Sequence, residues 1–276
     1  MICPFCQSDK ILKKLRVYSE ILKKERVCSV CKKCGSINQD TTPSESEIKE
    51  YYEAYEEIKG EMNPGYLSDD QLISFFRERD KTLKEIGFPI SSIIQGANVE
   101  LGCANGQFLR YLKNKNANNI VGIDISKKLI ESVNLEGVKL INGDFTKIDD
   151  NAVDNLFMFN VLEHIPLIND TIAQILRITK DNSNIIIEVP IAGFISGFFN
   201  EKWRFLMPDE HLHIPSVKGL KALLSRYDLF ILGFTRFGSG YTAGSINPKF
   251  KEIFDLLAKK TKIGDRGAFL IKKTKK

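Results

Sequence analysis

The chain has 276 residues, of which 43% are hydrophobic and 27% are charged, as in ordinary folded globular domains. General disorder is therefore excluded, and no membrane span is expected because no apolar run approaches the ~20 residues that cross a bilayer. The first residues do not have the basic-then-apolar pattern of a secretory leader, so we expect a cytoplasmic location. The net charge of +5 is uneven, because residues 1–35 hold nine lysines and arginines against three acidic residues.

Five of the six cysteines lie in the first 34 residues. The four that form two Cys-x-x-Cys pairs are Cys3, Cys6, Cys31 and Cys34. Each such turn directs two thiolates to one point, so the pairs predict a structural, tetrahedral Zn²⁺ site in a ribbon of residues 1–38. Two alternatives stay open: iron–sulfur or redox chemistry, and a ligand register in which Cys28 replaces Cys34.

Residues 39–92 are predicted to form a helical linker. Ser44 and Glu47 have the spacing of a capping box, which predicts a helix from there to about residue 57. A second helix is expected at about residues 68–87, where apolar side chains recur at helical spacing and Gly87 ends the pattern.

From about residue 93, short apolar runs alternate with helix-length segments. Strands are expected at residues 98–101, 120–123, 138–141, 153–159, 185–189, 229–234 and 268–272. Helices are expected at residues 106–114, 126–135, 169–180, 216–226 and 248–260. Such alternation predicts parallel strands joined by right-handed crossovers. The fold class expected for residues 93–276 is α/β, a doubly wound, mostly parallel seven-stranded sheet.

A glycine-rich turn, Gly-Cys-Ala-Asn-Gly at residues 102–106, follows the first of these strands. Small residues there let the backbone approach a ligand at the N-terminus of a helix. Glu100 precedes the turn, and its carboxylate disfavours a pyrophosphate but suits an ammonium group. We therefore expect a ligand with a cationic amino acid end and a nucleoside end, against the simpler interpretation of a tight strand–helix turn.

Acidic residues follow the next two strands. Asp124 is placed to accept hydrogen bonds from both hydroxyls of a ribose. Asp144 is placed to accept from an adenine amino group, with Phe145 packing on the ring. Residues 153–166 add the fourth strand and the string Val-Leu-Glu-His-Ile-Pro. Because ligands of open parallel sheets bind at the carboxyl ends of the strands, these residues are expected at one edge.

This ordered set resembles the class I S-adenosylmethionine-dependent methyltransferases, although Ala104 stands where that family usually has glycine. The Val-Leu-Glu-His-Ile string resembles the ubiquinone-type, small-molecule branch. The resemblance implies a Rossmann-like methyltransferase domain at residues 93–276 and S-adenosylmethionine as its cofactor. The cofactor-binding residues that it implies are Glu100, Gly102, Ala104, Gly106, Asp124, Ile125, Asp144, Phe145 and Asn160.

The order of ribbon, linker and methyltransferase domain resembles a bacterial arrangement whose members often methylate sugars, nucleotide-linked sugars or other metabolites. We therefore expect O- or N-methylation of a small-molecule acceptor. Two alternatives are a tRNA or rRNA methyltransferase that grips RNA with the basic ribbon, and a non-catalytic zinc-binding adaptor that keeps only the fold.

The three histidines, His164, His211 and His213, are the candidate catalytic residues. His164 follows the fourth strand, and the other two follow the fifth strand and an aromatic loop at residues 193–205. Methyl transfer needs a base only where the acceptor must lose a proton. Each histidine is therefore interpreted as a base, as an anchor of the acceptor or as a hydrogen-bonding residue that fixes its own segment.

Overall fold

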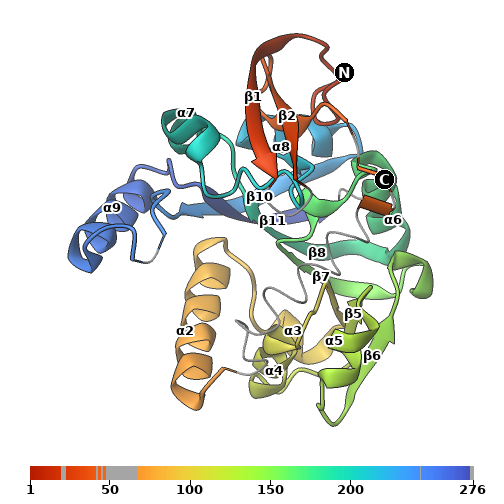
Figure 1. The fold of residues 1–276 in the computed structure, drawn as a ribbon. Coiled ribbons are helices and arrows are strands. Elements are labelled where there is room, and N and C mark those ends of the chain that lie inside the picture. Colours follow the sequence, from red (N-terminus) through yellow and green to blue (C-terminus); the bar gives the residue numbers. More distant parts are fainter. Residues whose placement is uncertain (20–22, 42, 45, 48–66, 243, 274–276) are drawn as a thin grey trace.

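Two β-sheets organise the chain in the computed structural model, which describes residues 1–19, 23–41, 43–44, 46–47, 67–242 and 244–273. The larger sheet consists of β4 (Asn98–Leu101), β5 (Ile120–Asp124), β6 (Val138–Asn142), β7 (Val153–Phe159), β8 (Thr179–Pro190), β10 (Leu229–Phe237) and β11 (Arg266–Lys273). The smaller sheet consists of β1 (Ile11–Ser19), β2 (Lys24–Cys31), β3 (Ile37–Gln39) and β9 (His213–Ile214). In Figure 1 the hairpin of β1 and β2 stands above the larger sheet.

The seven strands of the larger sheet are ordered β10-β11-β8-β7-β4-β5-β6. Strands β4 to β8 are parallel to one another, whereas β11 is antiparallel to both β8 and β10. The expected fold class, a doubly wound and mostly parallel seven-stranded sheet, is confirmed. The chain winds outward in opposite directions on the two sides of β4, and open sheets bind ligands at the carboxyl ends beside such a reversal.

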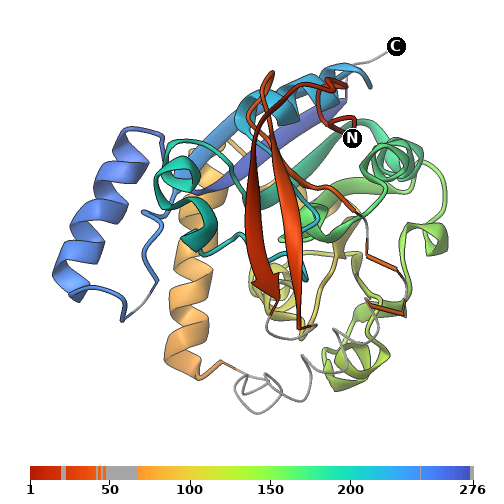
Figure 2. The ribbon, with the colours of Figure 1, turned by 45° about the horizontal axis from the view of Figure 1, so that its top comes forward.

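Helices cover both faces of this sheet. They are α2 (Asp69–Glu85), α3 (Ser92–Gln95), α4 (Gln107–Asn114), α5 (Lys127–Ser132), α6 (Ile168–Ile178), α7 (Phe194–Phe199), α8 (Val217–Ser225) and α9 (Pro248–Lys260). Short 3₁₀ turns are η1 (Phe145–Lys147), η2 (Leu162–His164) and η3 (Asn200–Lys202). Both views place α9 at one end of the molecule and β6 at the other (Figure 1, Figure 2).

The side chains of β7 show why the sheet needs cover on both faces. Leu156 and Met158 pack into the core that includes α6 and α8, whereas Phe157 packs into the core of α2 and α4. Successive strand residues point to opposite faces, so a strand buried on both faces reads as a continuous apolar run. This explains the apolar run at residues 156–159 of β7, a strand that the sequence predicts with the bounds that the structure has.

The smaller sheet joins two distant parts of the chain. Strand β3 pairs antiparallel with β9, which places Asn38 opposite His213. The sequence predicted neither β3 nor β9. The N-terminal sheet therefore crosses the boundary predicted at residue 38, and the three-part division of the chain stays a prediction.

The capping box predicted for the linker is present. The main-chain N–H of Glu47 donates to the hydroxyl of Ser44 at 3.3 Å, and a carboxylate oxygen of Glu47 accepts from the N–H of Ser44 at 2.9 Å. The rest of that predicted helix lies outside the described residues. Ser68 caps α2, the second predicted helix. No helix in the described ranges is long and apolar enough to cross a bilayer.

Candidate functional site

The glycine-rich turn carries the chain from the end of β4 into α4. Gly102, Ala104 and Gly106 have φ values of +72°, +45° and +75°, in the left-handed region that favours glycine. A Cβ built on Gly102 would lie 2.5 Å from Cγ2 of Val161. Position 102 therefore has no room for a side chain, whereas Ala104 fits its methyl group into the same backbone conformation.

Asp124 closes this turn from the end of β5. Its Oδ2 accepts from the N–H of Ala104 at 2.9 Å, and its Oδ1 accepts from the N–H of Ser126 at 2.9 Å. A carboxylate oxygen has lone pairs for more than one donor, so both oxygens keep capacity for a ligand. Ile125 is 72% exposed beside it and offers an apolar surface. The bracing of the turn by Asp124 is a role that the sequence did not indicate.

Three further predicted residues follow β6 and β7. Oδ1 of Asp144 accepts from the N–H and the hydroxyl of Thr146 at 2.9 and 2.7 Å, and these bonds lower the pKa of Asp144. Phe145 is 8% exposed and belongs to the core on the α6 side, so its packing on an adenine ring stays a prediction. Asn160 is exposed with a φ of +53°, and its N–H donates to the carbonyl of Glu188 at 2.8 Å.

Glu100 is a buried carboxyl group, 4% exposed, at the carboxyl end of β4. Its Oε2 has no hydrogen-bond partner among the described residues. Burial raises the pKa of Glu100 well above its usual value. The positive charge of Arg79 lowers this pKa, and the negative charge of Asp124 raises it further. A buried polar atom without a partner costs free energy, so this oxygen fits a ligand that brings an N–H donor.

Arg79 reaches this edge from α2, and the sequence analysis missed it. Its Nη1 donates to Oε2 of the fully buried Glu188 at 2.7 Å, and its guanidinium carbon lies 4.6 Å from the ring centroid of Phe159. Its Nε has no hydrogen-bond partner within the described ranges. The sequence does contain a sign of this role, because Arg79 is a charged residue within an apolar helical stripe that includes Phe76 and Leu83.

Two of the three predicted histidines lie side by side. The rings of His164 and His211 are 4.9 Å apart between centroids and meet edge to face. Glu163, fully buried, places its Oε1 4.0 Å from Nε2 of His164. Burial raises the pKa of Glu163 to about 8 and, together with the charge of His211, lowers that of His164 to about 3. His164 and His211 thus lie together with Glu163, and a catalytic role for either histidine stays a prediction.

His213 lies apart from this pair, on the seam between the two sheets. Its Nδ1 is 3.2 Å from Oδ1 of Asn38, and its Nε2 is 3.3 Å from the carbonyl oxygen of Pro166. Both ring nitrogens therefore face partners within the fold. A catalytic role for His213 stays a prediction, and its contacts support the alternative of a histidine that fixes its own segment.

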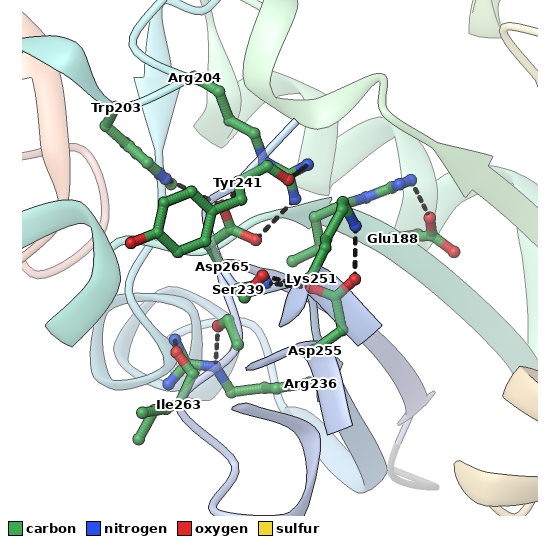
Figure 3. A network of polar contacts seen from close by, with 12 residues as sticks. Glu188, Trp203, Arg204, Arg236, Ser239, Tyr241, Lys251, Asp255, Ile263 and Asp265 are labelled. Carbon is green, nitrogen blue, oxygen red and sulfur yellow. Dashed lines mark hydrogen bonds and ion pairs between the residues drawn. The ribbon is translucent and has the colours of Figure 1, made fainter. Parts of the chain in front are cut away.

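The aromatic segment between β8 and β9 is anchored on one buried carboxylate, Asp265 (Figure 3). Trp203 donates from Nε1 to Oδ2 of Asp265 at 3.1 Å. Arg204 donates from Nε and Nη2 to the two oxygens of Asp265 at 3.0 and 2.9 Å. The bidentate contact fixes the segment that leads to His211.

Residues 238–241, which follow β10, are also held in place by side-chain contacts. The N–H and the hydroxyl of Ser239 both donate to Oδ1 of Asp255, which pairs with Lys251 on α9 at 2.5 Å (Figure 3). The ring of Tyr241 contacts those of Phe199 and Phe254. The segment is thus held between α7 and α9.

The four thiols of the two Cys-x-x-Cys pairs converge in the ribbon. Sγ of Cys3 lies 3.7 Å from Sγ of Cys34, and Sγ of Cys6 lies 3.5 Å from Sγ of Cys31. Sulfurs bound tetrahedrally to one zinc ion at about 2.3 Å are about 3.8 Å apart, so the donor set and spacing fit zinc. Cys28 lies outside this group, in the core with Leu15, and burial raises the pKa of its thiol to about 12.

The ribbon docks on α8 through specific contacts. The hydroxyl of Ser216 donates to the carbonyl of Cys34 at 2.5 Å, and the N–H of Ser216 donates to the hydroxyl of Ser36 at 3.0 Å. Arg226 donates from Nη2 to the carbonyl of Pro4 at 2.8 Å. A Cβ on Gly219 would overlap Ser36, so α8 approaches the ribbon as closely as it does only because residue 219 is glycine.

Known proteins resemble this chain in sequence family and in fold. A family model described as "Methyltransferase domain" matches residues 59–232. No match was found among curated proteins. The fold resembles an S-adenosylmethionine-dependent methyltransferase from Archaeoglobus fulgidus, with 17% identity, a TM-score of 0.51, and coverage of 81% of this chain and 100% of that chain.

Two further solved structures have the same fold. One is an S-adenosylmethionine-dependent methyltransferase from Thermotoga maritima, with 15% identity, a TM-score of 0.53, and coverage of 81% of this chain and 100% of that chain. The second comes from Mesorhizobium loti, with 15% identity, a TM-score of 0.50, and coverage of 65% of this chain and 92% of the other. At these identities the likeness concerns the fold alone.

Proposed function

Because the chain belongs to the methyltransferase-domain family, we propose that it transfers the methyl group of S-adenosylmethionine to an oxygen or nitrogen atom of a small-molecule acceptor. One observation carries the proposal. The unpaired carboxyl of Glu100, the left-handed turn and the bracing carboxylate of Asp124 meet at the carboxyl ends of β4 and β5. This is the edge where a doubly wound sheet binds its ligand.

The two ends of S-adenosylmethionine suit different parts of this edge. Glu100 accepts from the ammonium group, and Arg79, with its unpaired Nε, is placed near Glu100 to meet the carboxylate. Asp124 holds the ribose hydroxyls, and the exposed side chain of Ile125 gives the adenine an apolar surface. Asp144, Phe145 and Asn160 complete the nucleoside side, as the resemblance implies.

S-adenosylmethionine, when bound, supplies a methyl group on a sulfonium that is already a good leaving group. The task of the chain is therefore to align the acceptor and to exclude water. His164 and His211 lie just after β7 and just before β9, where an acceptor would approach. We assign them to the side of the edge that receives the acceptor.

A small-molecule acceptor agrees better than RNA with the charges of the ribbon. Lys14 pairs with Asp40 at 2.7 Å, and Arg16 pairs with Glu25 at 2.5 Å. Cations that already have carboxylate partners offer little to a phosphate backbone. The ubiquinone-type branch remains a resemblance that rests on the string at residues 161–165. A non-catalytic adaptor would need no acceptor site, and the assembled His164–His211 pair favours an enzyme.

We also propose that Cys3, Cys6, Cys31 and Cys34 hold a structural zinc ion. Their four buried thiols match the chemistry of a closed zinc site. A module of about 40 residues is too small to fold on its own core, so a metal would supply folding free energy.

Calorimetry with S-adenosylmethionine tests the proposal. The protein is expected to bind it, and Asp124→Asn, which removes the charge but keeps the size, should weaken binding about 10–100-fold, the effect of losing charged hydrogen bonds. Asp181→Asn is the matched control, because Asp181 lies near the start of β8, away from the site, and its side chain is 65% exposed. Absence of binding, or equal affinity in Asp124→Asn, would contradict the proposal.

A further inference from the structure

A second cluster of metal-ligating side chains lies beside the proposed donor site. Glu163, His164 and His211 each offer one donor atom, and the three atoms lie within 4.8 Å of one another. They come from two segments, η2 after β7 and the turn before β9. The N–H of Leu212 donates to the carbonyl of Glu163 at 2.8 Å, which holds the two segments together.

Three polar atoms of this cluster lack a partner on any other described residue. Two are the carboxylate oxygens of the fully buried Glu163, on which only the main-chain N–H of Glu163 itself acts. The third is Nδ1 of His164. Buried polar groups in folded proteins are nearly always satisfied, so three unsatisfied atoms in one place point to a ligand between them.

His211 is oriented as a metal ligand would be. Its Nδ1 lies 2.7 Å from the carbonyl oxygen of Phe205, which can only accept a hydrogen bond. The proton is therefore on Nδ1, and the lone pair is on Nε2. A backbone carbonyl that fixes the tautomer in this way is the usual outer-shell partner of a metal-binding histidine.

We propose that Glu163, His164 and His211 bind one divalent first-row transition metal ion, separate from the ion of the four cysteines. Imidazole and carboxylate together suit zinc, iron or nickel. Two donors at about 2.1 Å from one ion lie at most about 4.2 Å apart. The three donor atoms lie within 4.8 Å of one another, so small side-chain rotations bring them to one ion.

The electrostatic surroundings agree with a bound cation. Arg266, the cation near Glu163, is itself paired with Glu188 at 2.5 Å, and the carboxylate of Glu210 adds negative charge near Glu163 and His211. The side chain of His164 is 24% exposed, which gives an ion a route from solvent. Three protein ligands leave positions open for an oxygen-bearing acceptor; this last step rests on the proposed function.

Metal analysis of the tag-free protein tests the site. After incubation with Zn²⁺ and dialysis, the protein should retain a second zinc ion besides that of the four cysteines. His211→Ala and the near-isosteric Glu163→Gln should each lose the second ion, whereas His213→Ala should keep it. Near-ultraviolet circular dichroism verifies that each variant is folded.

Two results would overturn the inference: a single zinc ion in the unmodified protein, or a second ion retained by both His211→Ala and Glu163→Gln. S-adenosylmethionine binding is measured on the same samples. The metal site and the methyl donor site can therefore fail independently, since the metal count requires no methyl transfer.

Discussion

The main-chain N–H of Gln39 donates to the carbonyl of Leu212 at 2.9 Å. Leu212 lies between His211 and His213, and its own N–H donates to the carbonyl of Glu163. The side-chain amide of Gln39 also donates to the carbonyl of Pro208. A continuous path of hydrogen bonds thus joins the cysteine-rich sheet to the segment after β7. The N-terminal sheet holds in place the turn that brings His211 to His164.

Loss of the proposed zinc ion should therefore loosen a segment far along the chain. Cys31→Ser is expected to release the zinc ion and lower Tm by about 5–15 °C, because a structural metal contributes folding free energy. Hydrogen exchange should accelerate at residues 207–214 and stay unchanged at residues 120–142. Cys28→Ser is the matched control and should keep the zinc ion. Zinc retention in Cys31→Ser would refute the ligand set.

The close approach of α8 to the ribbon predicts the effect of one methyl group. Gly219→Ala should destabilise the protein by about 1–3 kcal/mol, because the new Cβ meets Ser36 and forces the ribbon away. Gly197→Ala in α7 is the control, since nothing lies within 4 Å of its Cβ position. There the gain in helix propensity should leave stability unchanged or raise it by up to about 1 kcal/mol. Urea unfolding of both variants gives the comparison.

Glu100 is expected to lower the stability of the folded protein and to strengthen the binding of S-adenosylmethionine. Its pKa is raised in the folded state, so folding favours the protonated form. Ionisation of Glu100 therefore lowers the free energy of unfolding. This loss is absent below the unfolded pKa of about 4.3 and grows as pH rises through the folded pKa. Glu100→Gln should therefore leave Tm nearly unchanged at low pH and raise it at neutral pH.

The same substitution should weaken S-adenosylmethionine binding about 10–100-fold, because the ammonium group loses its charged acceptor. The charged neighbours Arg79 and Asp124 are left in place, so the effect isolates residue 100. Lower stability of Glu100→Gln at neutral pH, or full affinity for the donor, would show that Glu100 has a different role.

The paired charges of the ribbon predict weak RNA binding. Fluorescence anisotropy with single-stranded RNA at about 0.15 M salt should give no Kd below about 10⁻⁶ M, the limit of non-specific binding. Glu25→Gln should tighten binding, because it frees Arg16 from its exposed ion pair. Tight binding that Arg16→Ala abolishes would instead favour the RNA methyltransferase alternative.

Local sequence patterns were sufficient to predict the strands of the larger sheet. The sequence predicts β4 and β7 with the bounds that the structure has. The prediction of a methyltransferase is confirmed by the family match. Strand β8 begins at Thr179, within the helix predicted to end at residue 180, because apolar residues alone do not locate that boundary.

Contacts between distant segments could not be predicted in this way. Strand β9 has only two residues and pairs with Ile37 and Asn38, so it is too short for a periodic sequence pattern to predict it. The pattern His-Leu-His left the roles of the two histidines open. The chain turns at residues 207–211, where the N–H of His211 donates to the carbonyl of Met207, so the two rings face different partners.

A crystal structure of the protein with S-adenosylhomocysteine tests the central claim most directly. The account predicts that the ligand lies along the carboxyl ends of β4 and β5, with its ammonium group at Glu100 and its ribose at Asp124. Ligand density at another part of the molecule, or none at saturating concentration, would contradict it.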